Sequence, residues 1–248
     1  MSTAPRFPAA PGLPDVMLLA AGLGRRMRPL SEHTPKPLLD VAGVAMLDRV
    51  IAEATAEGFS RFVINAHYHA AQLRAHVAAL AEGSRSLRFR LSEEPELLDT
   101  GGGVKQALGL LETDPLLVMN TDAFWPPGSD YPLARLIARF AQDTADIVLL
   151  CVQPHRALGF RRGHDFCLDP RGRLTRDAGQ PVIYGGVTLI RRALLEATAE
   201  RRFSLYRLFI AALERERLAG IVLDAPWLHV GDPEALVAAE TFLAAPAG

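Results

Sequence analysis

From Asp15 onward, short runs rich in apolar and β-branched residues alternate with longer runs whose apolar residues recur at helical spacing. The pattern predicts strands at residues 16–20, 61–65, 87–92, 115–120, 146–152, 181–190 and 220–224. It predicts helices at residues 44–56, 70–80, 104–111, 133–141, 204–216 and 233–243. Such an alternation is typical of a sheet with helices on both faces, so we expect an α/β fold.

A chain of 248 residues is long enough for one α/β domain with a core that needs neither disulfides nor a structural metal. No internal repeat or low-complexity linker interrupts the alternation, so we expect a single domain over residues 15–248. Residues 1–14 contain four prolines and lack the apolar segment of a signal peptide. This composition predicts a disordered leader.

Charge and hydropathy exclude several classes of partner. Lys and Arg number 27 against 28 Asp and Glu, without the basic excess with which proteins hold nucleic acid. The longest stretch without a charged residue covers residues 178–190, too short to cross a bilayer. Cys151 and Cys167 are the only cysteines and form no CxxC pair. We therefore expect a reduced, cytoplasmic protein that binds neither nucleic acid nor membrane.

A glycine-rich turn with cationic side chains follows the first predicted strand. Residues 18–27 read Leu-Leu-Ala-Ala-Gly-Leu-Gly-Arg-Arg-Met, and Pro-Lys-Pro-Leu follows at 35–38. Without a Cβ at Gly22 and Gly24, backbone N–H groups can approach a phosphate closely. The turn is neither GxGxxG, whose third glycine is Met27 here, nor a Walker loop. An ordinary strand-to-helix turn is the alternative, but it would crowd cations together without an anionic partner.

These segments resemble the sugar-1-phosphate nucleotidyltransferases, whose pattern is L-A-A-G-x-G-x-R-[ML] followed by P-K-P-L. The similarity runs from Val16 to the last helix and is greatest to the short branch typified by N-acetylmuramate-1-phosphate uridylyltransferase, which shares Asp-Thr-Gly-Gly-Gly at 99–103. The resemblance implies a Rossmann-like α/β/α sandwich with a mostly parallel mixed sheet and one active-site cleft. It also implies that Arg26 and Lys36 are catalytic, phosphate-binding residues.

Nucleotidyl transfer itself requires such cations. The reaction brings an anionic sugar phosphate to an anionic α-phosphorus, so positive charge must already be in place. We expect Arg26 to contact the β- and γ-phosphates and Lys36 to lie nearer the α-phosphate and the nucleophile. A general base is not required, because a phosphate monoester with a second pKa of about 6 is largely a dianion at neutral pH.

A carboxylate ends the apolar segment at 117–122, which reads Leu-Val-Met-Asn-Thr-Asp. Ligands of open α/β sheets lie beyond the carboxyl ends of strands, which would place Asp122 beside the glycine turn. The matching family segment is N-G-D, and the resemblance implies that Asp122 is catalytic and holds Mg²⁺; Thr121 replaces the glycine. The alternative is that Asp122 is only a turn residue.

The segment at 227–233 departs from the family at a second metal ligand. Its counterpart is W-x-D-V-G-T-P, and this chain has His229 in place of the aspartate. Mg²⁺ prefers oxygen ligands, whereas Mn²⁺ accepts imidazole more readily. His229 is therefore a candidate metal ligand, a substrate-phosphate contact or a passive wall. Asp232, followed by Pro233 and Glu234, is expected to cap the last helix.

The resemblance also suggests which residues contact the nucleobase. Residues 93–103 resemble the family loop that lies along the base, with Thr100 capping the following helix and Gly101 letting the base pack on backbone. The other side of the base would be lined by the main chain of Ala20, Ala21 and Gly22. A plain loop with a helix cap is the alternative.

Three further glycines, Gly163, Gly185 and Gly186, lie where the family shapes its sugar pocket. The pair Gly185 and Gly186 falls inside a predicted strand, where it is destabilising unless a ligand or a bulge needs the room. The polar, arginine-rich stretch at 156–176 predicts inserted hairpins with a solvated face, or one arginine that reaches an acidic sugar. His67 and His69 are expected in a strand-to-helix loop rather than at a metal.

Together these features predict an Mg²⁺-dependent, or Mn²⁺-dependent, enzyme that joins a nucleoside triphosphate to a sugar 1-phosphate and releases pyrophosphate. The substrates expected are UTP and N-acetylmuramate α-1-phosphate, in peptidoglycan recycling. Two alternatives stay open: a mannose-1-phosphate guanylyltransferase, and a non-catalytic nucleotide-sugar-binding subunit, suggested by His229. The sequence leaves the base, the sugar and the oligomeric state open.

Overall fold

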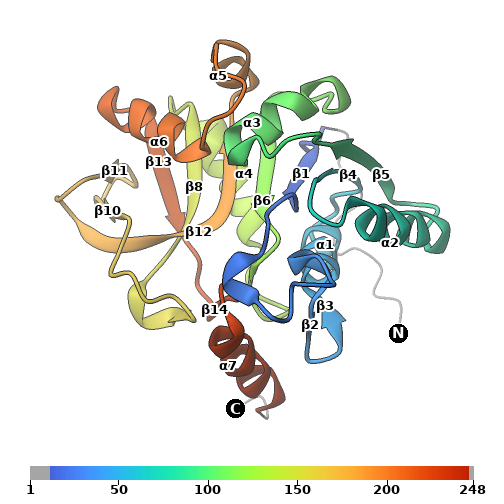
Figure 1. Ribbon diagram of the computed structural model, residues 1–248. Helices are drawn as coiled ribbons and strands as arrows, with labels where there is room; N and C mark the ends of the chain where they lie inside the picture. The colour runs from blue at the N-terminus through green and yellow to red at the C-terminus, as the bar shows by residue number, and fades with distance from the viewer. Residues whose placement is uncertain (1–11, 246–248) are drawn as a thin grey trace.

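The computed structural model describes residues 12–245, and the centre of this part of the chain is a nine-stranded mixed sheet (Figure 1). Its main path runs in the order β11-β10-β12-β6-β1-β4-β5, and β8 pairs with both β12 and β13. The strands are β1 (Val16–Leu19), β4 (Arg61–Ala66), β5 (Arg88–Glu93), β6 (Leu116–Asn120), β8 (Ile147–Val152), β10 (Phe166–Leu168), β11 (Leu174–Thr175), β12 (Gln180–Ile190) and β13 (Leu218–Val222). All seven predicted strands are present, within about two residues.

The strands that carry the predicted site are parallel. β6, β1, β4 and β5 pair in parallel, with Val16 opposite Phe62 on one side and Leu117 on the other. β12 is antiparallel to both β6 and β8, and β8 is parallel to β13. The sheet is therefore mixed and mostly parallel around β1, as expected, and the carboxyl ends of four parallel strands lie along one edge.

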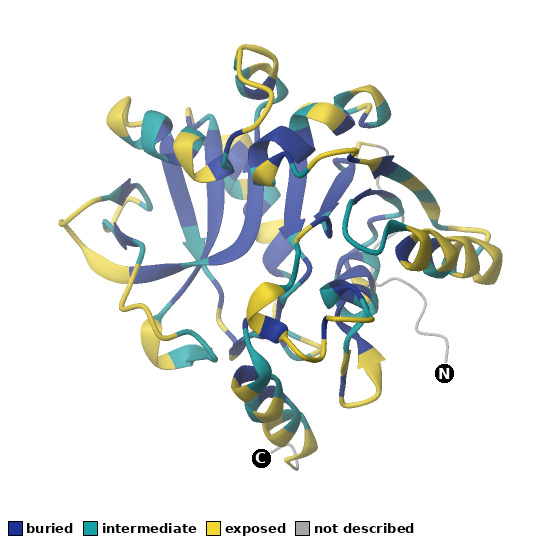
Figure 2. Ribbon diagram, viewed as in Figure 1, coloured by how far each residue is buried: buried dark blue, intermediate teal, exposed yellow. Residues whose placement is uncertain are grey.

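Helices cover both faces of the sheet, which confirms the predicted α/β/α sandwich. They are α1 (Met46–Ala56), α2 (Ala70–Gly83), α3 (Asp99–Gln106), α4 (Pro132–Gln142), α5 (Arg192–Glu196), α6 (Leu205–Glu214) and α7 (Pro233–Ala244), with 3-10 turns at Arg25–Met27, Lys36–Leu38, Ala107–Leu110 and Pro154–Arg156. One buried cluster contains side chains of α1 and α4, and the other contains side chains of α3, α5 and α6. Figure 2 shows the buried strands between these exposed outer layers.

The apolar periodicity explains why these helices pack as they do. In α4, Leu133, Leu136 and Phe140 are buried and lie three or four residues apart, whereas its charged side chains face outward. Glu57 caps α4 from α1, because its carboxylate accepts from the N–H groups of Leu133 and Ala134. The predicted cap of α7 is also present, since Asp232 accepts from the Ala235 N–H at 2.9 Å. The polar caps of α4 and α7 and the buried apolar face of α4 are thus those that the sequence pattern requires.

A small second sheet lies outside the predicted pattern. It has the order β7-β14-β9, from β7 (Ala123–Phe124), β14 (Trp227–His229) and β9 (Ala157–Leu158). His229 is opposite Ala123, and the Val230 N–H donates to the Asp122 carbonyl at 2.9 Å. This sheet brings the segment around residue 229 to the end of β6. A hairpin of β2 (Asp40–Val41) and β3 (Val44–Ala45) contacts α7 below it.

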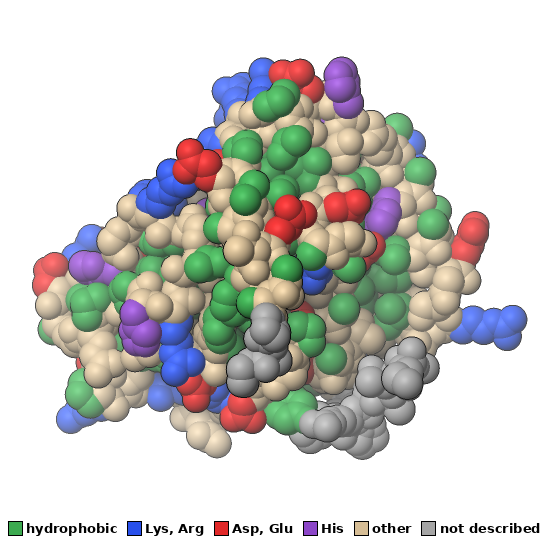
Figure 3. All heavy atoms as spheres, turned by 90° about the horizontal axis from the view of Figure 1, so that it is seen from below, with side chains coloured by type: hydrophobic (Ala, Val, Ile, Leu, Met, Phe, Trp, Pro, Cys, Tyr) green, Lys and Arg blue, Asp and Glu red, His purple; other side chains and the backbone are tan. Residues whose placement is uncertain are grey.

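The arginine-rich insert forms short strands, as predicted. β10 and β11 make an antiparallel hairpin that joins the edge of β12, and β9 enters the small sheet. Its arginines pair with acids at the surface; Arg156 contacts Asp224 at 2.9 Å, and Arg161 contacts Glu234. On the face in Figure 3, acidic and basic side chains are interspersed rather than gathered by sign. The solvated-face interpretation therefore fits the structure.

The predicted leader at residues 1–14 falls mostly outside the described residues, which begin at Gly12. Leu13 nevertheless packs against the core, and its carbonyl accepts from Arg61 Nη2 at 2.8 Å. The folded part therefore begins at least two residues before Asp15. Cys151 and Cys167 are both buried and unpaired. Among the described helices, none has the length and apolar character that crossing a bilayer demands.

Candidate active site

A cleft lies beyond the carboxyl ends of β1, β4 and β6, where ligands of open α/β sheets bind. It has two compartments of about 430 and 420 Å³. Five residues line both compartments: Gly22, Lys36, Leu97, Asp122 and Arg202. The two predicted halves of the site, the glycine turn after β1 and the carboxylate after β6, therefore share one cavity.

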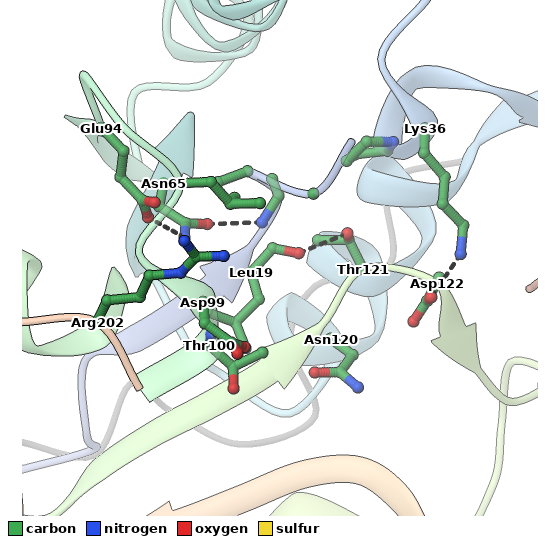
Figure 4. Close-up of a pocket in the computed structure, with 15 residues that line it drawn as sticks. Leu19, Lys36, Asn65, Glu94, Asp99, Thr100, Asn120, Thr121, Asp122 and Arg202 are labelled. Carbon is green, nitrogen blue, oxygen red and sulfur yellow. Dashed lines mark hydrogen bonds and ion pairs between the residues drawn. The ribbon is translucent and has the colours of Figure 1, made fainter. Parts of the chain in front are cut away.

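The loop after β1 lines both compartments. The first compartment, shown in Figure 4, is bordered by Ala20, Ala21 and Gly22, and the second by Gly24 and Arg26 among others. Gly24 has φ +60°, and a Cβ there would lie 3.0 Å from the Cβ of Ser31. The Ser31 hydroxyl donates to the Gly24 carbonyl at 2.7 Å, which fixes the turn. Among the described residues, no hydrogen bond or ion pair holds the Arg26 side chain, so its donors are free.

Lys36, which lies next to Gly24, forms an ion pair with Asp122. Lys36 Nζ lies 2.5 Å from Asp122 Oδ2 (Figure 4). Burial raises the pKa of Asp122, but the charge and hydrogen bond of Lys36 together with His229 and Arg26 outweigh this effect, so the pKa lies below its ordinary value. The carboxylate is thus ionised at neutral pH, and Lys36 holds positive charge at the junction of the two compartments.

Thr121 has a structural role that explains its replacement of the family's glycine. Its hydroxyl donates to the Leu19 carbonyl at 2.8 Å and so joins the end of β6 to the end of β1. Asn120, the last residue of β6, also lines the first compartment. The strand end that carries Asp122 is therefore tied directly to the strand that carries the glycine turn.

His229 lies near Asp122 and packs closely against Trp227 and Gly231. Its Nε2 is 3.9 Å from Asp122 Oδ2, and its ring stacks on Trp227 with centroids 5.6 Å apart. Burial lowers the pKa of His229, although Asp122 acts in the other direction. Nδ1 lies 3.5 Å from the Gly159 carbonyl. A carbonyl only accepts, so this contact favours the proton on Nδ1 and leaves the Nε2 lone pair on the side of Asp122.

The side chains around Asp122 fit a divalent metal ion that is held partly by the protein and partly by substrate phosphates. No group of three or more His, Cys, Asp or Glu side chains converges anywhere in residues 12–245. Asp122 offers carboxylate oxygen, and His229 offers one nitrogen. Mg²⁺ is commonly held by one or two carboxylates, with waters and substrate phosphates completing its shell. One ionised carboxylate beside a phosphate-sized compartment therefore fits such an ion, whereas a permanent protein-only site is absent from the described residues.

Two expectations about the base loop are wrong. Gly101 lines neither compartment: its N–H donates to the Phe203 carbonyl at 2.9 Å, and a Cβ there would lie 2.3 Å from the Phe203 ring. Its lack of a side chain therefore serves packing inside the protein rather than contact with a base. Thr100 lines the first compartment but does not cap α3, because its hydroxyl accepts from the Leu205 N–H at 2.9 Å, at the start of α6.

The three glycines assigned to the sugar pocket line neither compartment. Gly163 lies in an exposed loop with no atom near its missing Cβ. Gly185 and Gly186 form the bulge that separates two registers between β12 and β8. Gly186 has φ +83°, and a Cβ there would lie 3.1 Å from the Cβ of Ala123. The room that Gly186 leaves is therefore taken by Ala123 of the small sheet, and the room that Gly185 leaves is taken by Leu150 and Val152 of β8.

Sequence reasoning missed a buried polar network on the floor of the first compartment. Asn65 accepts from the Ala20 N–H at 2.6 Å and donates to Glu94 at 2.6 Å, and Glu94 accepts from the Leu98 N–H at 3.0 Å (Figure 4). The network joins the ends of β1, β4 and β5 to α3. The signal in the sequence was that Asn65 ends one predicted strand, at 61–65, and Glu94 closely follows another, at 87–92.

The loop after β4 contains the histidines that the sequence assigned to a loop rather than a metal. His67 Nδ1 lies 2.8 Å from the Glu94 carbonyl, and His69 Nε2 lies 3.0 Å from the Glu32 carbonyl. Both therefore donate to backbone oxygens, which supports that interpretation. Arg202 was also missed: it comes from the loop between α5 and α6 and lines both compartments.

A sheet of this order, with a free cationic loop after its first strand and a carboxylate at the end of the adjacent strand, defines an α/β protein built to bind a nucleotide. Residues 16–218 match the model of the MobA-like NTP transferase domain, and the chain belongs to this family of nucleotidyltransferases.

Curated relatives share nearly the whole length. The chain is 34% identical to N-acetylmuramate alpha-1-phosphate uridylyltransferase of Caulobacter vibrioides, over 98% of this chain and 99% of the relative. It is 33% identical to the Neisseria meningitidis enzyme of the same name, over 87% and 92%. Mannose-1-phosphate guanylyltransferase of Mycobacterium tuberculosis is 27% identical, over 90% of this chain and 62% of the relative.

Solved structures show the same fold. HddC from Yersinia pseudotuberculosis, complexed with GMP-PN, superposes with a TM-score of 0.74 at 23% identity, over 93% of this chain and 100% of that one. UTP-bound UGPase from Acinetobacter baumannii gives a TM-score of 0.74 at 17% identity, over 92% of each chain. These likenesses confirm the fold that the sequence predicted.

Proposed function

We propose that this nucleotidyltransferase transfers a uridylyl group from UTP to N-acetylmuramate α-1-phosphate, giving the nucleoside diphosphate sugar and pyrophosphate. One observation carries the reaction type: the free cationic loop after β1 and the Lys36–Asp122 pair border one cleft. The two uridylyltransferase relatives, which match this chain over most of its length, support the choice of substrates.

The residues of the loop would bind the triphosphate. Gly22 and Gly24 line the second compartment, where their backbone N–H groups would bind phosphate oxygens, and Arg26 brings a planar fork of donors for the β- and γ-phosphates. Lys36 would leave Asp122 for the α-phosphate, where negative charge grows as the reaction proceeds. The positive charge that neutralises Asp122 in the free protein is thus moved to the substrate.

The acceptor supplies its own nucleophile. A phosphate oxygen of the sugar 1-phosphate forms a bond to the α-phosphorus, and the bond from that phosphorus to the bridging oxygen of the β-phosphate breaks. Pyrophosphate leaves with that oxygen. Because the acceptor is a dianion near neutral pH, the protein needs cations rather than a base, which agrees with the residues around the cleft.

We propose that Asp122 holds a divalent metal, with His229 as its second protein ligand. When bound, Mg²⁺ or Mn²⁺ would neutralise phosphate charge and align the leaving pyrophosphate. The ionised Asp122 and the Nε2 lone pair of His229 support this assignment. We further propose a cytoplasmic role in peptidoglycan recycling, for which the free cysteines and the uridylyltransferase relatives are the support.

The decisive experiment measures pyrophosphate release from four nucleoside triphosphates against several sugar 1-phosphates, with Mg²⁺ and then with Mn²⁺. We expect the greatest release from UTP with N-acetylmuramate α-1-phosphate. Greatest release from GTP with mannose 1-phosphate would instead support the guanylyltransferase alternative, which the 27% identical relative favours. A protein that binds UTP yet releases no pyrophosphate would be a binding subunit.

Variants test the assigned residues in the same assay. Asp122→Ala should lower kcat by about a hundredfold or more, as should Lys36→Ala, because each removes charge at the reacting phosphate. Asp232→Ala is the control, since that residue caps α7. Turnover near the wild-type rate in both Lys36→Ala and Arg26→Ala would show that the phosphate site is assigned wrongly.

A further inference from the structure

The three consecutive glycines of α3 have a packing role that leads to the cleft. A Cβ at Gly102 would lie 2.4 Å from the Arg201 carbonyl, and a Cβ at Gly101 would overlap the Phe203 ring. In their place, the N–H groups of Gly101 and Gly102 donate to the Phe203 carbonyl at 2.9 and 3.0 Å, and the Phe203 N–H donates to the Leu98 carbonyl at 3.2 Å. The glycines thus bind the segment 201–203 against the start of α3.

This packing places one arginine in the cleft and its neighbour outside. Arg201 pairs with Glu96 at 2.8 Å and lines neither compartment. Arg202 lines both compartments and borders the first together with Asn65 and Glu94; Figure 4 shows it across the cavity from Lys36. Among the described residues, no hydrogen bond or ion pair engages Arg202. A free cation therefore borders the same compartment as the Asn65–Glu94 network.

Most of the other polar side chains of the first compartment are engaged by the protein. Asn65 bonds to Ala20 and Glu94, Glu94 bonds to Leu98, and Thr100 bonds to Leu205, whereas the Asn120 side-chain amide has no hydrogen-bond partner among the described residues. Arg202 is the cation of this compartment whose donors are free, and a guanidinium has five N–H donors and no acceptor. A ligand group beside it is thus recognised through its acceptor oxygens or nitrogens.

Building on the proposed function, we propose that Arg202 reads the edge of the nucleobase and favours bases that carry a carbonyl where others carry an amino group. Uracil and guanine present O4 and O6 at the position where cytosine and adenine present an amino group, which is itself a donor. Arg26 lines only the second compartment, and Lys36 lies across the first compartment from Arg202 (Figure 4), so we assign these two cations to the phosphates. In this assignment Arg202 is a specificity-determining residue rather than a third cationic phosphate ligand.

The test compares dissociation constants of UTP, GTP, CTP and ATP by isothermal titration calorimetry, with Mg²⁺, for the wild type, Arg202→Ala and Arg202→Gln. Arg201→Ala is the matched control from the same loop. We expect Arg202→Ala to weaken UTP and GTP about tenfold and to change CTP and ATP less than twofold. Arg201→Ala should leave all four unchanged. Because Arg202 is exposed, the thermal midpoint of its variants should stay near that of the wild type.

Two results would overturn the inference. If the Arg202 variants bound all four nucleotides and inorganic tripolyphosphate equally more weakly, Arg202 would be a phosphate ligand. If they bound all four nucleotides as the wild type does, Arg202 would not contact the nucleotide. Failure of the proposed reaction would be seen separately, as the absence of pyrophosphate release by the wild type, and would leave these binding constants measurable.

Discussion

At the scale of single residues, the charged side chains of the cleft are of two kinds, those that form an ion pair and those that do not. Lys36 neutralises Asp122, whereas Arg26 and Arg202 have no partner in the described part of the chain. Keeping two unpaired cations in one compartment is unfavourable unless an anionic ligand neutralises them. The sequence indicated Arg26 through its motif, but Arg202 has no motif and became visible only when its loop was placed.

His229 gives a prediction about metal preference. His229→Asp replaces a nitrogen ligand with a carboxylate, so we expect Mg²⁺ to bind more tightly relative to Mn²⁺ than in the wild type. The measurement is the affinity for Mn²⁺ by electron paramagnetic resonance, with Mg²⁺ as competitor, in the presence of UTP. His155→Asp, in an exposed 3-10 turn, is the control. An unchanged ratio of the two affinities would mean that residue 229 does not contact the metal.

At the scale of elements, the structure shows why α3 contains three consecutive glycines at 101–103. Gly101 and Gly102 receive the segment 201–203, and a Cβ at Gly103 would lie 2.6 Å from Asn65 and from Glu94. The resemblance assigned this run to a nucleobase, whereas the structure places the protein's own segments against these glycines. Glycine allows close approach by any partner, and the sequence does not say whether that partner is ligand or protein.

Gly102→Ala tests this element directly. Its Cβ would lie 2.4 Å from the Arg201 carbonyl, so backbone must move, and we expect the free energy of unfolding to fall by about 1–3 kcal/mol. UTP should also bind more weakly, because Arg202 moves with the segment. Gly109→Ala is the matched control, since nothing lies within 4 Å of its missing Cβ. Both quantities come from urea unfolding and calorimetry, and a Gly102→Ala protein as stable as the control would refute the packing role.

At the scale of the whole molecule, the helix layer behind the cleft contains a carboxyl group that makes stability depend on pH. Burial, together with the charge of Glu57, raises the pKa of Glu53 on α1 to about 7. Its folded pKa thus exceeds the unfolded value. The group favours the folded state fully below about pH 4.3, the ordinary pKa of glutamate, and that contribution is lost as the pH rises toward 7.

Glu53→Gln removes this titration. We expect the urea midpoint of the variant, relative to the wild type, to be higher at pH 8 than at pH 5, because the wild type alone must hold a buried charge at pH 8. Glu82→Gln, at an exposed position of α2, should show the same difference at both pH values. If Glu53→Gln also differed from the wild type by the same amount at pH 5 and pH 8, the Glu53 carboxylate would be in water, which would contradict its burial.

The sequence by itself determined the seven main strands, most of the helices that cover them, the cationic turn and the acid of the cleft, but it missed α5 and the start of α3 at Asp99. Each feature that it determined depends on periodicity or on spacing within one segment, and such signals are local. Tertiary structure decided the rest. Strands of two or three residues, such as β7, β9 and β14, are too short to show a period, and their pairing brings His229 to Asp122. Arg202, about 80 residues beyond Asp122 in the chain, enters the cleft only because glycines let its loop pack against α3. A contact between distant segments depends on which surfaces fit together, and that fit appears only when the chain is folded.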